Sequence, residues 1–123
     1  MVNEIKLNYN TFGDATIYKV KYQSNYFNKG EKCSKDVDVL LNCYNWQLNK
    51  WEKIQLMFKG VKSIRFVETA QRPSTVVFEA LMIDKEDVIF DFFPIQVDGR
   101  GNLQEDPKSD FSIHCKSVDY KVL

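Results

Sequence analysis

Three side chains are the candidates for general acid–base chemistry: Asp91, Glu79 and His114. An enzyme built on them would need all three groups in one cleft. His114 is the only histidine, and in a regular strand its neighbour Cys115 would point to the opposite face. The two therefore cannot hold one metal ion or form a nucleophilic dyad. We expect no catalytic centre, no metal site and no cofactor.

Asp91 differs from the other carboxylates because it interrupts an apolar run from Val88 to Phe93. A carboxylate in such a run must be paired or hydrogen-bonded, since burying an unpaired charge is costly. We predict an ion pair with Arg65 or a lysine, and Asp91 is also a candidate for a polar contact with a partner or ligand. Glu79, between Phe78 and Ala80, is a candidate for a specific polar contact for the same reason.

Aromatic side chains gather in the first half of the chain and flank its turns. Tyrosine and tryptophan combine a large apolar area with a polar group, and they are enriched in protein interfaces. Most of the rings are expected in the core. The candidates for contact with a partner or a ligand are Tyr18, Tyr22, Trp46 and Trp51.

The charges balance, with 17 lysines and arginines against 17 aspartates and glutamates. No bulk field draws the protein to nucleic acid or to an anionic membrane, so we expect neither as a partner. The three cysteines Cys33, Cys43 and Cys115 form no CxxC pair, which favours reduced thiols. With no signal-peptide pattern and no apolar run near the ~20 residues of a spanning helix, we expect a cytoplasmic protein.

Apolar and polar residues alternate with a period of two, which is typical of half-buried strands. The alternation begins at Ile5, Leu7 and Tyr9 and returns in segments around residues 18–22, 37–44, 53–58 and 111–122. Two further runs, Thr75 to Ile83 and Val88 to Val97, are nearly continuous and predict central strands. We expect one all-β domain over residues 1–123: an antiparallel sandwich or a curved, partly closed sheet of about eight strands with at most a short helix.

Turn residues separate these segments, and we expect hairpins at 84–87, at Asp98-Gly99 and near Leu48-Asn49-Lys50. The last strand changes parity after Cys115, which predicts a bulge near Lys116-Ser117. The residues expected to be buried are Val39, Leu41, Ile54, Leu56, Phe58, Phe78, Phe90 and Phe92.

A resemblance to a known group of proteins spans most of the chain, and its clearest segments are residues 12–17, residues 51–61 and the terminal strand 111–115. In strand order and residue types the chain resembles small all-β bacterial proteins of unknown function, some of which are grouped with immunity proteins of polymorphic toxin systems. The resemblance implies a cytoplasmic protein that neutralises a toxin by binding it.

We therefore expect a non-enzymatic domain that binds another protein, with a cognate bacterial toxin as one such partner. The alternative is a small-ligand-binding curved sheet or barrel with aromatics around an apolar cavity. An exposed sheet edge would also allow a homodimer.

Overall fold

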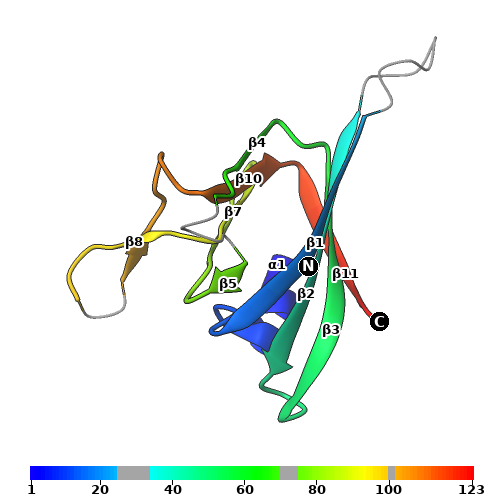
Figure 1. Cartoon of the computed structure of the whole chain (residues 1–123), viewed down its shortest axis with the longest axis vertical. Coiled ribbons are helices and arrows are strands. Elements are labelled where there is room, and N and C mark those ends of the chain that lie inside the picture. The colour runs from blue at the N-terminus through cyan, green and yellow to red at the C-terminus, as the bar shows by residue number, and fades with distance from the viewer. Residues whose placement is uncertain (25–33, 70–74, 100–101) are drawn as a thin grey trace.

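The computed structural model describes residues 1–24, 34–69, 75–99 and 102–123 (Figure 1). Cys33 lies outside these ranges, and so does the segment Arg72-Pro73-Ser74, for which the sequence also predicts a turn. The elements are α1 (Val2–Tyr9), β1 (Ala15–Ser24), β2 (Lys35–Asn45), β3 (Lys50–Lys59), β4 (Ser63–Phe66), β5 (Val76–Val77), β6 (Leu81–Asp84), β7 (Val88–Asp91), β8 (Ile95–Gln96), β9 (Leu103–Gln104), β10 (Phe111–Cys115) and β11 (Ser117–Val122).

The strands form two antiparallel sheets and a small ribbon. The larger sheet has the order β11-β3-β2-β1-β5, the second has the order β4-β10-β7-β6, and β8 pairs with β9. Figure 1 shows the two sheets joined where β10 runs into β11. The predicted all-β antiparallel architecture is confirmed, and neither sheet closes into a barrel.

The core follows the alternation that the sequence displays. Val37, Val39, Leu41 and Cys43 of β2 point inward together with Ile54, Leu56 and Phe58 of β3. Burial of seven of the eight expected core residues is confirmed, since each is 0% exposed. The eighth, Phe78, is 79% exposed, and that prediction is wrong. It follows the two-residue strand β5, where the chain leaves the sheet and alternation no longer decides burial.

The prediction of a first strand through Ile5, Leu7 and Tyr9 is also wrong, because Val2–Tyr9 is the helix α1. Its buried residues Val2, Ile5 and Tyr9 are spaced by three and four, which is the helical period, whereas Leu7 is 62% exposed. The helix contacts β2 and β11 of one sheet and β6 of the other.

The two nearly continuous apolar runs do not form long strands. Thr75 to Ile83 divides into β5 and β6, and Val88 to Val97 divides into β7 and β8. Pro94 lacks an N–H for a ladder, and β7 ends three residues before it. The expected hairpin at 84–87 is confirmed by the β6–β7 pairing, and the one at Asp98-Gly99 by the β8–β9 pairing.

The parity change near Lys116 is confirmed, but its cause is a change of sheet. β10 pairs with β4 and β7, whereas β11 pairs with β3 in the larger sheet. The backbone N–H of Lys116 donates to the carbonyls of both Lys59 and Gly60, at 3.1 and 3.2 Å. Because the single residue Lys116 separates the two strands, core-facing side chains lie at odd-numbered positions in β10 and at even-numbered positions in β11.

Candidate protein-binding surface

The β2–β3 hairpin fixes the position of both tryptophans. The side-chain oxygen of Asn45 accepts hydrogen bonds from the backbone N–H groups of Gln47 (2.9 Å) and Leu48 (3.0 Å). Asn49 adopts a φ of 53°, a left-handed conformation that asparagine tolerates better than most residues. The turn expected near Leu48-Asn49-Lys50 is thus confirmed. Its geometry places Trp46 just after β2 and Trp51 opposite Tyr44 in the ladder.

A part-buried polar network joins this hairpin to α1. The Tyr9 hydroxyl donates a 2.9 Å hydrogen bond to Glu52, and the Asn45 amide donates to the same carboxylate oxygen. Burial raises the pKa of Tyr9 well above its usual range, and the hydrogen bond to Glu52 raises it further. The hydroxyl therefore stays protonated and remains a donor. The backbone N–H of Trp46 also donates to the Asn8 carbonyl at 2.7 Å. The hairpin therefore rests on α1.

Three aromatic rings pack together on the outer side of the hairpin. The Tyr44 ring lies 4.8 Å from Trp46 and 5.7 Å from Trp51, measured between centroids, and both contacts are edge-to-face. This is a favourable geometry for aromatic pairs. Trp46 and Trp51 nonetheless remain 55% and 52% exposed. The rings hold each other in place while presenting a large apolar area to solvent.

Tyr18 extends this cluster across the sheet. The register of β1 against β2 shifts between Ile17 and Lys19, so Tyr18 has no cross-strand partner on β2. Its ring is 48% exposed and lies 5.7 Å from the Nζ atom of Lys53, in cation–π geometry. Lys53 is two residues after Trp51 on β3, so both share one face.

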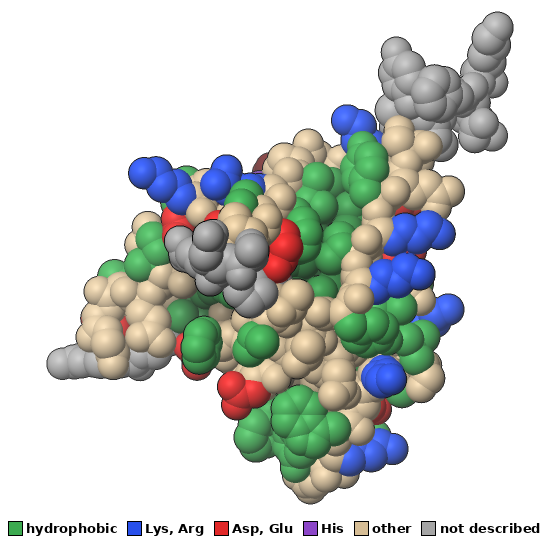
Figure 2. All heavy atoms as spheres, in the orientation of Figure 1, with side chains coloured by type: hydrophobic (Ala, Val, Ile, Leu, Met, Phe, Trp, Pro, Cys, Tyr) green, Lys and Arg blue, Asp and Glu red, His purple; other side chains and the backbone are tan. Residues whose placement is uncertain are grey.

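Cross-strand register shows which other side chains share this outer face. Lys19 aligns through Leu40 and Gln55 with Lys121, and Asn42 aligns with Lys53. The acidic residues of the face, which are Asp36, Asp38 and Asp119, align nearer the other end of the ladders. Figure 2 shows lysine or arginine side chains beside apolar ones along this flank. We define the aromatic–lysine surface as Tyr18, Lys19, Tyr44, Trp46, Trp51 and Lys53.

The structure thus brings together three of the expected contact residues, Tyr18, Trp46 and Trp51. Tyr22 is 51% exposed but aligns with buried Val37, so it belongs to the opposite parity. Lys19 and Lys53 were missed as site residues because only the strand register places them beside the rings. Tyr44 was also missed as a contact residue, and its ring contacts with Trp46 and Trp51 depend on the hairpin geometry.

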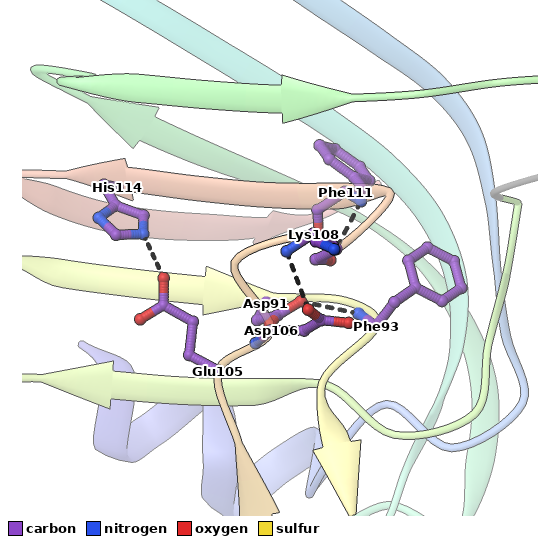
Figure 3. A network of polar contacts seen from close by, with 8 residues as sticks. Asp91, Phe93, Glu105, Asp106, Lys108, Phe111 and His114 are labelled. Carbon is purple, nitrogen blue, oxygen red and sulfur yellow. Dashed lines mark hydrogen bonds and ion pairs between the residues drawn. The ribbon is translucent and has the colours of Figure 1, made fainter.

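Asp91 lies elsewhere and is fully buried. Its two carboxylate oxygens accept hydrogen bonds from the backbone N–H groups of Phe93 (3.0 Å) and Asp106 (2.8 Å), as Figure 3 shows. The expected ion pair with Arg65 or a lysine is wrong, because Arg65 instead donates from Nε to the Ser109 carbonyl. Backbone donors satisfy the carboxylate without bringing a second charge into the interior.

His114 and Asp91 share the outer face of the second sheet, since their ladder partners are Ile89 and Ser112. The His114 Nε2 atom lies 2.7 Å from a carboxylate oxygen of Glu105 (Figure 3). Asp91 and His114 therefore contact adjacent residues, Asp106 and Glu105, of the segment that crosses this face. Glu79 joins neither contact. Among the residues that the structure describes, no group of three or more His, Cys, Asp or Glu side chains is placed to hold a metal ion.

Comparison with known proteins adds no neighbour. No protein-family model, curated protein or solved structure matches this chain. Within the described ranges, no helix is long and apolar enough to cross a membrane.

Proposed function

We propose that this chain is a non-enzymatic, cytoplasmic protein-binding domain whose aromatic–lysine surface contacts an acidic region of its partner. The observation that carries the proposal is a cluster of half-exposed rings on a supported hairpin. Trp46, Trp51 and Tyr18 are each about half accessible to solvent, and lysines lie beside them.

Such a surface has the properties of an energetic centre of an interface. Tryptophan and tyrosine supply most of the binding energy in many interfaces when a partner excludes water from them. Their mutual packing lowers the conformational entropy lost on binding. Lys19 and Lys53 would favour a partner with carboxylates around an apolar centre, through charge complementarity at the rim.

The kind of partner follows from the resemblance to immunity proteins. An immunity-type inhibitor neutralises a toxin by covering its surface, and it needs no catalytic group of its own. In the described residues, the acid–base side chains Asp91 and His114 already contact other parts of the chain. We propose a cognate bacterial toxin as the partner.

The test is co-expression with the products of the neighbouring reading frames. We expect one product to inhibit growth, the wild-type chain to restore growth, and the two purified proteins to form a complex measurable by calorimetry. The double variant Trp46→Ala/Trp51→Ala should bind at least tenfold more weakly. Val97→Ala shortens the side chain of a residue that is 59% exposed and lies outside this surface, and this variant should bind within twofold of wild type.

Two outcomes would overturn the proposal. One is a complex with unchanged affinity in the double tryptophan variant. The other is binding of a single-stranded oligothymidine that is lost in the same variant, because stacking rings beside lysines also suit nucleic acid.

One observation favours the alternative of small-ligand binding. A groove of about 360 Å³ is lined by Ile17, Tyr18 and Val20 of β1 and by Phe66 of β4, among others. Figure 2 shows an apolar strip on this face of the molecule. A ligand in this groove would contact Phe66 but not Trp46. A Phe66→Ala variant should therefore weaken binding of a small ligand but not binding of a protein partner through the tryptophans, which distinguishes the two functions. The same groove borders the β1 edge, where pairing with a second copy would produce a dimer detectable by light scattering.

A further inference from the structure

A second candidate site lies on the side of the molecule where the chain leaves β5. A pocket of about 120 Å³ is lined by Phe78, Glu79, Phe92, Phe93, Pro94, Gln96 and Leu103. None of these residues belongs to the aromatic–lysine surface. The lining is apolar except for one carboxylate and one amide.

Glu79 is the unusual member of this lining. Its Oε2 atom is buried, and no group in the described residues donates a hydrogen bond to it. Buried polar atoms in native proteins nearly always have a partner, so an orphaned carboxylate oxygen requires an explanation. A ligand that supplies the missing donor would satisfy this oxygen.

Phe78 is the second unusual member. Its side chain is 79% exposed, the largest exposed fraction among the large hydrophobic residues described. An exposed phenylalanine beside a half-buried glutamate with one unpaired oxygen provides an aromatic face and an acceptor within one small area. Cations are attracted to both, because the ring face carries partial negative charge.

The position of Phe93 is set by Asp91. The backbone N–H of Phe93 donates to the Asp91 carboxylate at 3.0 Å, and Figure 3 shows the Phe93 ring directed away from that contact. A part-buried hydrogen bond therefore holds the backbone of this part of the pocket wall in place. A preformed wall reduces the entropy that a ligand must lose on binding.

We infer that this pocket accepts the guanidinium group of an arginine from the protein partner. The choice of a cation rests on the unpaired Glu79 oxygen. The choice of guanidinium rests on shape, because a planar group can donate to a carboxylate while stacking on phenylalanine, whereas an ammonium is compact and strongly hydrated. The pocket, at about 120 Å³, is small enough to suit this group and too small for a large ligand. The protein source of the arginine rests on the function proposed above.

The test uses the peptide acetyl-Gly-Arg-Gly-amide as the probe. Titration into the ¹⁵N-labelled protein should shift the backbone amide signals of Phe78, Glu79 and Leu103 saturably, with a dissociation constant in the millimolar range. Glu79→Gln keeps the shape of the side chain and removes its charge, and it should weaken binding at least fivefold. Phe78→Ala should weaken binding by a similar factor.

Two matched peptides replace the arginine. Citrulline keeps its planar shape but has no charge, and lysine keeps the charge but has no planar group. Both should bind at least fivefold more weakly, and these comparisons hold even if Glu79→Gln does not fold. Equal binding of the citrulline peptide, or no shift with the arginine peptide, would overturn the inference. Equal binding of the lysine peptide would overturn the choice of guanidinium. The Trp46→Ala/Trp51→Ala variant should bind the peptide normally, so failure here is distinguishable from failure of the proposed function.

Discussion

The carboxylate of Asp91 accepts a 2.8 Å hydrogen bond from the backbone N–H of Asp106, fifteen residues further along the chain. Asp91 ends β7, and Asp106 lies in the segment that leads from β9 into β10. The neighbouring pair of His114 and Glu105 attaches the same segment to β10. A carboxylate and a histidine with catalytic potential are thus used here to attach a crossing segment to a sheet.

Asp91→Asn tests this attachment. The substitution replaces a carboxylate with an amide, so at least one of the backbone N–H groups of Phe93 and Asp106 must lose a charged acceptor or face an NH₂ group. We expect a loss of about 1–3 kcal/mol in the free energy of unfolding, measured by urea denaturation. Asp87→Asn is the control, because that carboxylate pairs with Lys62 at the surface and should contribute less than ~1 kcal/mol. Equal losses in the two variants would contradict the role given to Asp91.

Truncation of Phe90 should cost far more stability than truncation of Phe78, although the sequence predicts both in the core. Phe90 is 0% exposed, and its ring lies 5.0 Å from that of Phe58 in edge-to-face contact. Phe90→Ala should cost roughly 3–5 kcal/mol because it leaves a cavity. Phe78→Ala should change stability by about 0.5 kcal/mol or less, as at most exposed sites. A cost below ~1 kcal/mol for Phe90→Ala, measured by urea denaturation, would show that the core is misplaced.

Sequence reasoning succeeded where the period of two continued over many residues. From Val37 onward in β2, and from Ile54 to Phe58 in β3, every second side chain is buried. The alternation alone therefore identifies the core residues Val39, Leu41, Ile54, Leu56 and Phe58. It failed at the first element, because Ile5, Leu7 and Tyr9 fit a strand until Val2 is included and the helical spacing becomes visible. It also failed at Phe78, where a strand of only two residues gives the alternation no length over which to act.

The candidate surface could be predicted only in part. The exposed aromatics Trp46 and Trp51 flank a turn that the sequence marks clearly. The place of Tyr18 depends on the register shift next to Ile17, and no local pattern predicts that shift. The donors to Asp91 are backbone groups of distant residues, so residue types could not identify them.

Gly60→Ala should be more harmful than Gly99→Ala. Both glycines have positive φ, at 62° and 68°, so alanine at either site costs about 1–2 kcal/mol of backbone energy. At Gly60 a new Cβ would also lie 3.1 Å from the side-chain carbons of Lys116, whereas at Gly99 nothing lies within 4 Å. Overpacking should add roughly 1 kcal/mol at Gly60. Thermal or urea unfolding of the two variants measures this difference. Equal stability would contradict the close approach of Gly60 to Lys116, where the chain passes from β10 into β11.

The buried thiols should make the protein less stable at alkaline pH. Burial raises the pKa of Cys115 to about 11, and burial together with the Glu52 carboxylate raises the pKa of Cys43 to about 12, from an ordinary value of 9.0. Well below pH 9 both thiols are protonated in the folded and unfolded states, so they add no pH dependence there. Above pH 9 the unfolded chain loses these protons first, and the free energy of unfolding must fall as pH rises toward 11 and 12.

Cys115→Ala isolates one thiol from lysines and tyrosines that titrate in the same range. The variant should be less stable than wild type at pH 8, because a buried side chain is shortened. Its disadvantage should shrink between pH 9 and pH 10.5, since only wild type loses stability through this thiol. Urea denaturation at several pH values measures the difference between the two proteins. A difference that stays constant over this range would mean that Cys115 ionises as easily in the folded chain as in the unfolded one, and so is not shielded from water between the two sheets.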